Sequence, residues 1–283
     1  MVGARDKNKS YYMMKNVILW IAALILTLGS AYYQRTTGPT YPIRGKVQLG
    51  YETIKYKLIR TYGGPDNAEI SIDEPTGKIK GIFTYKRFKS YDEWTEVSMV
   101  NMGGKLVAYV PHQPPAGKVE YMIKLTDGTN TVELTEEPVI IRFKGHVPAY
   151  VLLPHILLMF LAMLFSTRTG IEVIARGSRT FTYTLFTTIF LLIGGLFLGP
   201  VMQKFAFGAY WTGWPMQGIF KFGDMTDNKT AVAFIFWLLA LYMLWKNPEK
   251  RGWALVAAIV LFLVYMIPHS MLGSEIDHTA MPQ

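Results

Sequence analysis

NVILWIAALILTLGSAYY, residues 16–33, is a continuous apolar run with no Asp, Glu, Lys or Arg. A helix needs roughly 20 such residues to cross a bilayer. Four further runs of this kind follow, at about 149–165, 180–198, 230–245 and 253–267. We therefore expect a membrane protein with about five transmembrane α-helices.

The composition supports the same fold class. Only 17% of the 283 residues are charged, against about 25% in ordinary globular chains. The net charge of +9 is attributed to cations that flank the apolar runs and contact membrane lipids. No nucleic-acid motif accompanies it, so nucleic acid is not an expected partner. The absence of cysteine excludes disulfides, iron–sulfur clusters and covalently attached haem.

The Lys and Arg residues that flank the apolar runs are distributed unevenly between the two sides of the membrane. Ten lie on one side of the membrane: Arg5, Lys7, Lys9, Lys15, Arg168, Arg176, Arg179, Lys246, Lys250 and Arg251. Three lie on the other side, Lys204, Lys221 and Lys229, when the long segment 34–147 is left out because long domains translocate largely regardless of their charge. Because Lys and Arg accumulate in cytoplasmic loops, we expect the N-terminus to be cytoplasmic and the C-terminus periplasmic. The expected location is the cell inner membrane, as a multi-pass protein.

These observations divide the chain into five segments. We predict a basic cytoplasmic N-terminus at 1–15, transmembrane helix 1 at 16–33, an extracytoplasmic β-sandwich domain at 34–147, a four-helix membrane domain at 148–269 with an aromatic-rich outer loop at 199–229, and an extracytoplasmic tail at 270–283. The first run also has the features of a cleavable signal peptide. A retained anchor is favoured because the run is long, and the orientation is the same in both cases.

The polar segment 34–147 has the pattern of short strands separated by turns. Its strand candidates are KVQLGYETIKYKLIRTY, GKIKGIFTYKRF, DEWTEV, KLVAYVP, VEYMIKLTD and TVELTEEPVIIRF. Turn residues separate them at Gly63-Gly64-Pro65-Asp66, Gly103-Gly104 and Asp127-Gly128. Strands repeating every 8–12 residues between such turns predict a β-sandwich.

Trp94 and the later stretch LVAYVPHQPPAGKVEYMIKLTDG carry a resemblance. Over about residues 80–145 this segment is similar to immunoglobulin or fibronectin type III-like modules, in which a Pro-Ala-Gly turn precedes a Tyr-rich strand that ends in Asp-Gly. The resemblance implies a fold, and such modules commonly bind partners or act as spacers. We expect Trp94 and Tyr121 to pack in the core.

Two of the five histidines stand out by their position. His155 lies inside the second run, and His269 lies at the end of the fifth, so both are expected near the outer membrane face. His155 is the only ionisable residue within the predicted spans, and such residues usually face the bundle interior and are functional. The structural alternative is a neutral imidazole that donates one hydrogen bond to a neighbouring carbonyl.

The predicted outer loop at 199–229 is rich in aromatic residues, including Tyr210, Trp211 and Trp214. A flexible polar linker would not have this composition. Asp224 and Asp227 follow at the start of the fourth run, where Asp227 or Asn228 is a natural helix N-cap.

His155, Trp211, Trp214 and His269 together weakly resemble the tryptophan-rich haem-handling proteins of cytochrome c maturation, which place such a loop between membrane histidines. The sequence 207–214, FGAYWTGW, departs from that family's tryptophan run, and the number of spans is low. The resemblance implies only that His155 and His269 are axial ligands of a haem, with Trp211 and Trp214, beside Tyr210, lining the porphyrin.

Several functions remain open at this point. Haem or quinone bound at the outer face would serve respiratory electron transfer or cytochrome assembly. Alternatively, the chain is a non-catalytic structural subunit or assembly factor of an envelope membrane complex, which docks other membrane or periplasmic proteins through its β-sandwich. A third hypothesis is a metalloenzyme that binds zinc through His155, His269, Asp224 and Asp227. No sequence motif decides whether the protein is an enzyme.

Overall fold

The computed structural model describes residues 2–210, 225–268 and 275–280. The chain forms two compact units. A helical unit takes Met1–Gly38, Val147–Gln203 and Tyr210–Gly273, and a β unit takes Pro39–His146, Lys204–Ala209 and Ser274–Gln283. The β-rich domain expected between the first and second apolar helices is therefore present.

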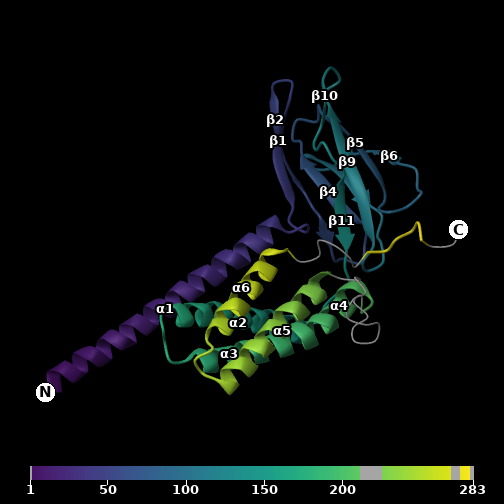
Figure 1. The fold of residues 1–283 in the computed structure, drawn as a ribbon. Helices are drawn as coiled ribbons and strands as arrows, with labels where there is room; N and C mark the ends of the chain where they lie inside the picture. The colour runs from purple at the N-terminus through teal and green to yellow at the C-terminus, as the bar shows by residue number, and fades with distance from the viewer. Residues whose placement is uncertain (1, 211–224, 269–274, 281–283) are drawn as a thin grey trace. The chain divides into compact units, whose positions relative to one another are not determined.

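The helical elements are shown in Figure 1. They are α1 (Val2–Thr37), α2 (Ala149–Ile174), α3 (Thr180–Phe190), a π-helical stretch (Leu191–Leu198), α4 (Gly199–Phe207), α5 (Met225–Lys246) and α6 (Gly252–Met266). Four helical stretches are long and apolar enough to cross a membrane: Ser10–Thr37, Ala149–Ile174, Thr180–Phe207 and Asn228–Lys246. The helix α6 is apolar but shorter. The described part of the chain thus has four or five helices that could span a membrane.

Helix α2 is longer than the apolar run predicts. It continues past residue 165 to Ile174, so it includes Glu172 and also Arg168, which was expected beyond the end of the span. Both side chains are buried, with 1% and 4% of the residue surface exposed. The statement that His155 is the only ionisable residue within a span is therefore wrong for the helix as it folds. Arg168 and Glu172 are four residues apart, so they pair on one face of the helix.

The predicted outer loop at 199–229 is shorter than expected. Residues Gly199–Phe207 form α4 and extend the third helical stretch, while α5 begins at Met225. Asp227 and Asn228 therefore lie within the first turns of α5 instead of capping it.

Small residues bring the helices close together. Gly194 lies so near α2 that an added Cβ would approach the Leu158 Cβ to 2.8 Å, and one on Gly195 would approach the Thr230 Cγ2 to 2.7 Å. Around the buried Trp237, the alanines of the core include Ala233, Ala240, Ala254 and Ala257. Small side chains at helix contacts are typical of membrane bundles, where backbones must approach closely to gain packing energy.

The β unit contains eleven strands in the described residues. They are β1 (Ile43–Leu49), β2 (Glu52–Leu58), β3 (Thr61–Tyr62), β4 (Ala68–Asp73), β5 (Lys80–Arg87), β6 (Thr95–Ser98), β7 (Val100–Asn101), β8 (Lys105–Val110), β9 (Lys118–Thr126), β10 (Thr131–Glu133) and β11 (Val139–Phe143). The predicted strand over 46–62 is instead a hairpin of β1 and β2 that turns at Gly50 (φ +60°), followed by β3.

The strands form three sheets. The hairpin β1–β2 is one, a six-stranded sheet has the order β3-β11-β9-β5-β6 with β10 beside β9, and a three-stranded sheet has the order β4-β8-β7. All pairs are antiparallel except β3 with β11. Side chains from all three sheets share one apolar core, which includes Leu49, Ile54, Ile70, Phe83, Leu106, Tyr121 and Ile141. Shared burial of this kind fits sheets packed face to face.

The two aromatic residues predicted in this core behave differently. Tyr121 is fully buried, as predicted, and its hydroxyl donates to the Ile59 carbonyl over 2.9 Å. Burial raises the pKa of Tyr121. The prediction for Trp94 was wrong, because its side chain is 40% exposed and lies under the Lys86 ammonium, 5.0 Å from the ring centroid.

Candidate functional site

His155 is held by a hydrogen bond to the π-helical stretch. Its Nδ1 lies 2.9 Å from the Gly194 carbonyl oxygen. Because a carbonyl oxygen only accepts, Nδ1 carries the proton, and Nε2 of the neutral ring keeps its lone pair. The hydrogen bond of the structural alternative is thus present. The same arrangement is also common for histidines that bind metals, where one ring nitrogen is fixed and the other coordinates.

Most of the other residues predicted around His155 lie outside the part of the chain that the structure describes. His269, Trp211, Trp214 and Asp224 lie outside the described residues, so their convergence with His155 stays a prediction. Asp227 is placed only as part of α5, and Tyr210 is 49% exposed. Within the described ranges, no group of three or more His, Asp or Glu side chains could hold a metal ion.

The helical unit contains a buried ionic cluster around Arg168 and Glu172 that was not predicted from the sequence. Arg168 donates from Nη1 to Glu172 Oε2 over 2.6 Å and from Nη2 to Asn16 Oδ1 over 2.8 Å. The second carboxylate oxygen of Glu172 accepts from the Arg179 backbone N–H over 3.0 Å. The Arg168 guanidinium also lies 5.5 Å from the Trp20 ring and 5.0 Å from the Tyr183 ring. The i, i+4 spacing was the available signal.

This ionic cluster joins α1, α2 and the segment that leads into α3. Paired ions stabilise a buried site only when their geometry and hydrogen bonds are complete. Here the carboxylate is well satisfied, while Arg168 Nε and the Tyr183 hydroxyl have no partner among the described residues. We interpret the cluster as a structural joint between helices.

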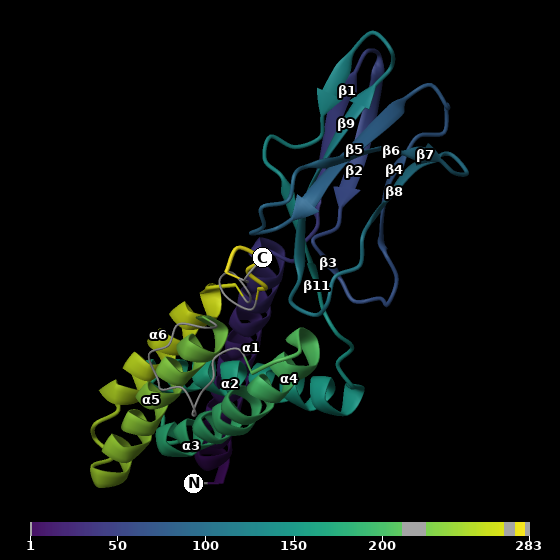
Figure 2. The same cartoon turned by 90° about the vertical axis from the view of Figure 1, so that its right-hand side faces the viewer.

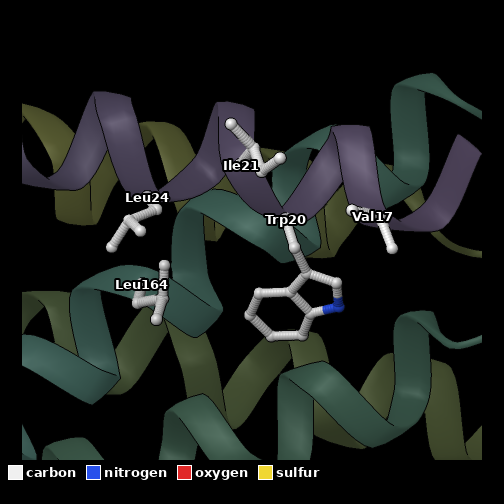
Figure 3. A pocket seen from close by; sticks show the side chains of 5 residues that line it. All are labelled: Val17, Trp20, Ile21, Leu24 and Leu164. Carbon is white, nitrogen blue, oxygen red and sulfur yellow. The ribbon is translucent and has the colours of Figure 1, made fainter. Parts of the chain in front are cut away.

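An apolar groove of about 260 Å³ lies between α1 and α2 next to that joint. It is lined by Val17, Trp20, Ile21, Leu24 and Leu164 (Figure 3). Its lining has almost no polar surface. An acyl chain or a neighbouring apolar helix fits this chemistry, whereas a polar substrate does not.

One edge of the β unit is open and apolar. The strands β6 and β7 follow one another along residues 95–101, β6 pairing only with β5 and β7 only with β8 in the described structure. Figure 2 draws them together at one margin of the domain. Every residue of both strands is exposed. We call residues 94–102 the open edge.

Apolar side chains are concentrated on the open edge. Trp94, Val97, Val100 and Met102 are 40%, 38%, 60% and 55% exposed. No charged residue occurs from Val97 to Met102. Edge strands are usually protected by charged side chains, by proline, or by a helix or loop that covers them, because their unpaired backbone groups can pair with another chain. The open edge has none of these protections over its second half.

The open edge is also held in place at its end. Asn101 donates from Nδ2 to Glu74 Oε2 over 2.9 Å, and Gly103 and Gly104 (φ +60° and +80°) close a tight turn into β8. Two consecutive left-handed residues are what a two-residue hairpin turn requires. The predicted turn at Gly103-Gly104 is confirmed.

No family model, no curated protein and no solved structure matches this chain. The candidate functional sites are therefore the two that its own geometry offers, the open edge and the hydrogen-bonded His155.

Proposed function

We propose that the protein is a non-catalytic, membrane-anchored subunit or assembly factor of an envelope complex, which docks a partner protein through the open edge of its β unit. The observation that carries this proposal is the edge at residues 97–102, which has no charged residue and is exposed at every position except the buried Met99. In the orientation favoured by the distribution of cations, this unit faces the periplasm of the inner membrane. The immunoglobulin or fibronectin type III-like character of the module belongs to the same proposal.

The geometry favours pairing through the main chain. Val97 is opposite the core residue Phe83, whereas Val100 is opposite Val107, which is buried but is not part of that apolar core. Because the exposed apolar side chains point to different faces, they do not form one flat patch. An added strand would contact both faces at once and would satisfy the free row of backbone groups.

The open edge is held in a fixed conformation, and this also favours binding. The hydrogen bonds from Asn101 to Glu74 and the glycine turn hold the strand before a partner arrives. A preformed edge loses little conformational entropy on binding, so more of the interaction energy appears as affinity.

The size of the native complex tests this proposal. Membranes are solubilised in a mild detergent, and the chain is followed by native electrophoresis and light scattering. We expect the wild-type chain in an assembly larger than the micelle-bound monomer, and Val100→Lys should release it as a monomer. Tyr51→Lys, at the fully exposed tip of the β1–β2 hairpin, is the matched control and should leave the assembly intact. A monomeric wild-type chain, or an assembly unaffected by Val100→Lys, would contradict the proposal.

A second candidate function is a haem or quinone site at His155. It is favoured by the Nδ1 hydrogen bond to Gly194, which leaves Nε2 free to accept a proton or to coordinate iron. The π-helical stretch that carries Gly194 adds to this, because such widened turns often occur at functional sites.

Absorption spectra of the purified protein test the second candidate. A haem ligand predicts a Soret band with sharp reduced α and β bands, lost in His155→Ala and in His269→Ala. A featureless spectrum from folded protein reconstituted with haem would remove the haem form of the candidate. Extraction and chromatography of bound lipids would then test for quinone.

A further inference from the structure

The last described segment of the chain, residues 275–280, lies on the β unit. Its Glu275 carboxylate accepts from two lysines, Lys118 through Oε2 and Lys89 through Oε1. Lys118 begins β9, and Lys89 lies in the connection between β5 and β6. One carboxylate of the C-terminal segment therefore joins two parts of the β unit that are distant in sequence.

Main-chain hydrogen bonds continue the contact on either side of the carboxylate. The Ile276 N–H donates to the Ala116 carbonyl over 3.4 Å, and the His278 N–H donates to the Lys89 carbonyl over 2.9 Å. Donors two residues apart point to the same side of an extended chain. The segment thus contacts the β unit as a short extended peptide does, with its backbone as well as its side chain.

The β unit has a reason to bind an anion at this place. Lys118 lies directly opposite Arg142 in the pairing of β9 with β11, and the two residues are only 8% and 5% exposed. Two like charges opposite each other destabilise a sheet. Lys is almost never buried without a partner. Burial and the charge of Arg142 lower the pKa of Lys118, while Glu275 acts in the opposite direction.

Aromatic rings lie beside both buried cations, Lys118 and Arg142. The Phe88 ring lies 5.2 Å from the Lys118 ammonium, and Arg142 contacts the Phe207 ring at 5.2 Å. Asp277 bonds to Thr279 within the segment itself, and its charge reaches Lys89 only as a minor contribution. Glu275 is thus the acidic group that lies between the two lysines.

We propose that the β unit has a binding site for an acidic, extended peptide segment, formed by Lys89, Lys118 and the Ala116 and Lys89 carbonyls, and that residues 275–278 of this chain are its ligand. The C-terminal segment is an intramolecular clasp on the β unit. This site does not involve the open edge, so the inference does not rest on the proposed docking function.

Hydrogen exchange of the full chain in detergent, read by mass spectrometry with residue-resolved fragmentation, tests the clasp. The backbone amides of Ile276 and His278 should be protected in the wild type. Loss of a charge-assisted hydrogen bond of this kind corresponds to a roughly ten- to hundredfold change in an equilibrium. Glu275→Gln should therefore lower the protection of both amides by about tenfold or more.

Asp277→Asn is the matched control, because it removes the same charge from the same segment without touching Lys118. It should change the protection of Ile276 far less than Glu275→Gln does. Protection of the β9 and β5 amides, unchanged in both variants, shows that the β unit stays folded. Absence of protection at Ile276 and His278 in the wild type, equal protection in Glu275→Gln, or equal loss in both variants would each overturn the inference.

Discussion

Each unit of the molecule contains a buried cation that is paired in a different way. In the helical unit, Arg168 is paired with Glu172, four residues along the same helix. In the β unit, Lys118 is paired with Glu275, which is 157 residues away in sequence. The first pair forms as soon as α2 forms. The second requires residues 275–278 to lie against the β unit, so it can open without unfolding any of the three sheets.

This difference implies two kinds of energetic role. A pair enclosed within a helical bundle cannot reach water, so losing one partner leaves the other charge buried. A pair whose carboxylate lies on a segment outside the strands and helices can dissociate, and the carboxylate can then be solvated. We expect the first pair to determine stability and the second to determine the position of the C-terminal segment.

The largest effect is expected at Arg168. Arg168→Met and Glu172→Gln, made separately, should each lower the free energy of unfolding of the helical unit by about 3–5 kcal/mol, because a buried charge loses its partner. The measurement is the loss of helical circular dichroism with denaturant in detergent. The double variant should lose less than the sum of the two. A single variant that costs under about 1 kcal/mol would show that water reaches the pair.

A smaller effect is expected at Lys118. Lys118→Met should cost the β unit less than about 1 kcal/mol, since it removes repulsion from Arg142 and lets Glu275 move into water. Unfolding of the β sheet followed by tryptophan fluorescence measures this cost. A loss as large as that expected for Arg168 would remove the proposed distinction between the two pairs.

The clasp should depend on pH at both ends of the range. Burial acts to raise the pKa of Glu275, but the hydrogen bonds from Lys118 and Lys89 outweigh it, so the pKa lies below its ordinary value of 4.5. The contribution of Glu275 is therefore fully present above pH 4.5 and is lost as the pH falls through the lowered pKa. On the alkaline side, Lys118 loses its proton first, because burial lowers its pKa from 10.5.

A spin label on Ala280→Cys checks this dependence, since the chain has no other cysteine. The label should be immobile near neutral pH and should become mobile as the pH falls through the lowered pKa of Glu275. In the Glu275→Gln background it should be mobile over the whole range. A wild-type label that is as mobile near neutral pH as it is in the Glu275→Gln background would contradict the carboxylate's role.

The smallest effect is expected at an exposed pair of the β unit. Arg87 donates to Asp92 from Nε and Nη2, both over 2.7 Å, and these hydrogen bonds lower the pKa of Asp92 to about 2. Because both side chains reach solvent, Asp92→Asn should cost under about 1 kcal/mol in a urea titration at pH 7. The contribution should persist above the ordinary pKa of 3.8 and disappear as the pH falls through about 2. A much larger cost would mean that solvent screening is weaker here than exposure implies.

The sequence predicted the features that depend on local periodicity. The apolar runs located the helices, and the alternating segments with Gly103-Gly104 and Asp127-Gly128 located most strands and turns of the β unit. The sequence placed the end of α2 too early, because an apolar run is taken to end at its first charged residue. In the structure the helix continues through Arg168 and Glu172, whose charges pair with each other. Trp94 was assigned to the core because aromatic residues are usually buried, yet it lies at the start of an edge strand.

The contacts between distant residues could not be predicted in this way. Nothing in the sequence around Lys118 indicates Glu275, and the open edge depends on which strands end each sheet. The sequence predicted that His155 is a candidate site residue, and the structure shows its hydrogen bond to the Gly194 carbonyl. His269 and the aromatic residues of the outer loop remain predictions, as does the ligand.

The docking proposal is tested most directly by crosslinking from defined positions in intact membranes. A photoreactive amino acid is placed at Val100 on the open edge, or at Tyr51 on the β1–β2 hairpin as the control. The account predicts one discrete adduct with a single partner from Val100 and none from Tyr51. Absence of an adduct from Val100, or the same mixture of adducts from both positions, would contradict it.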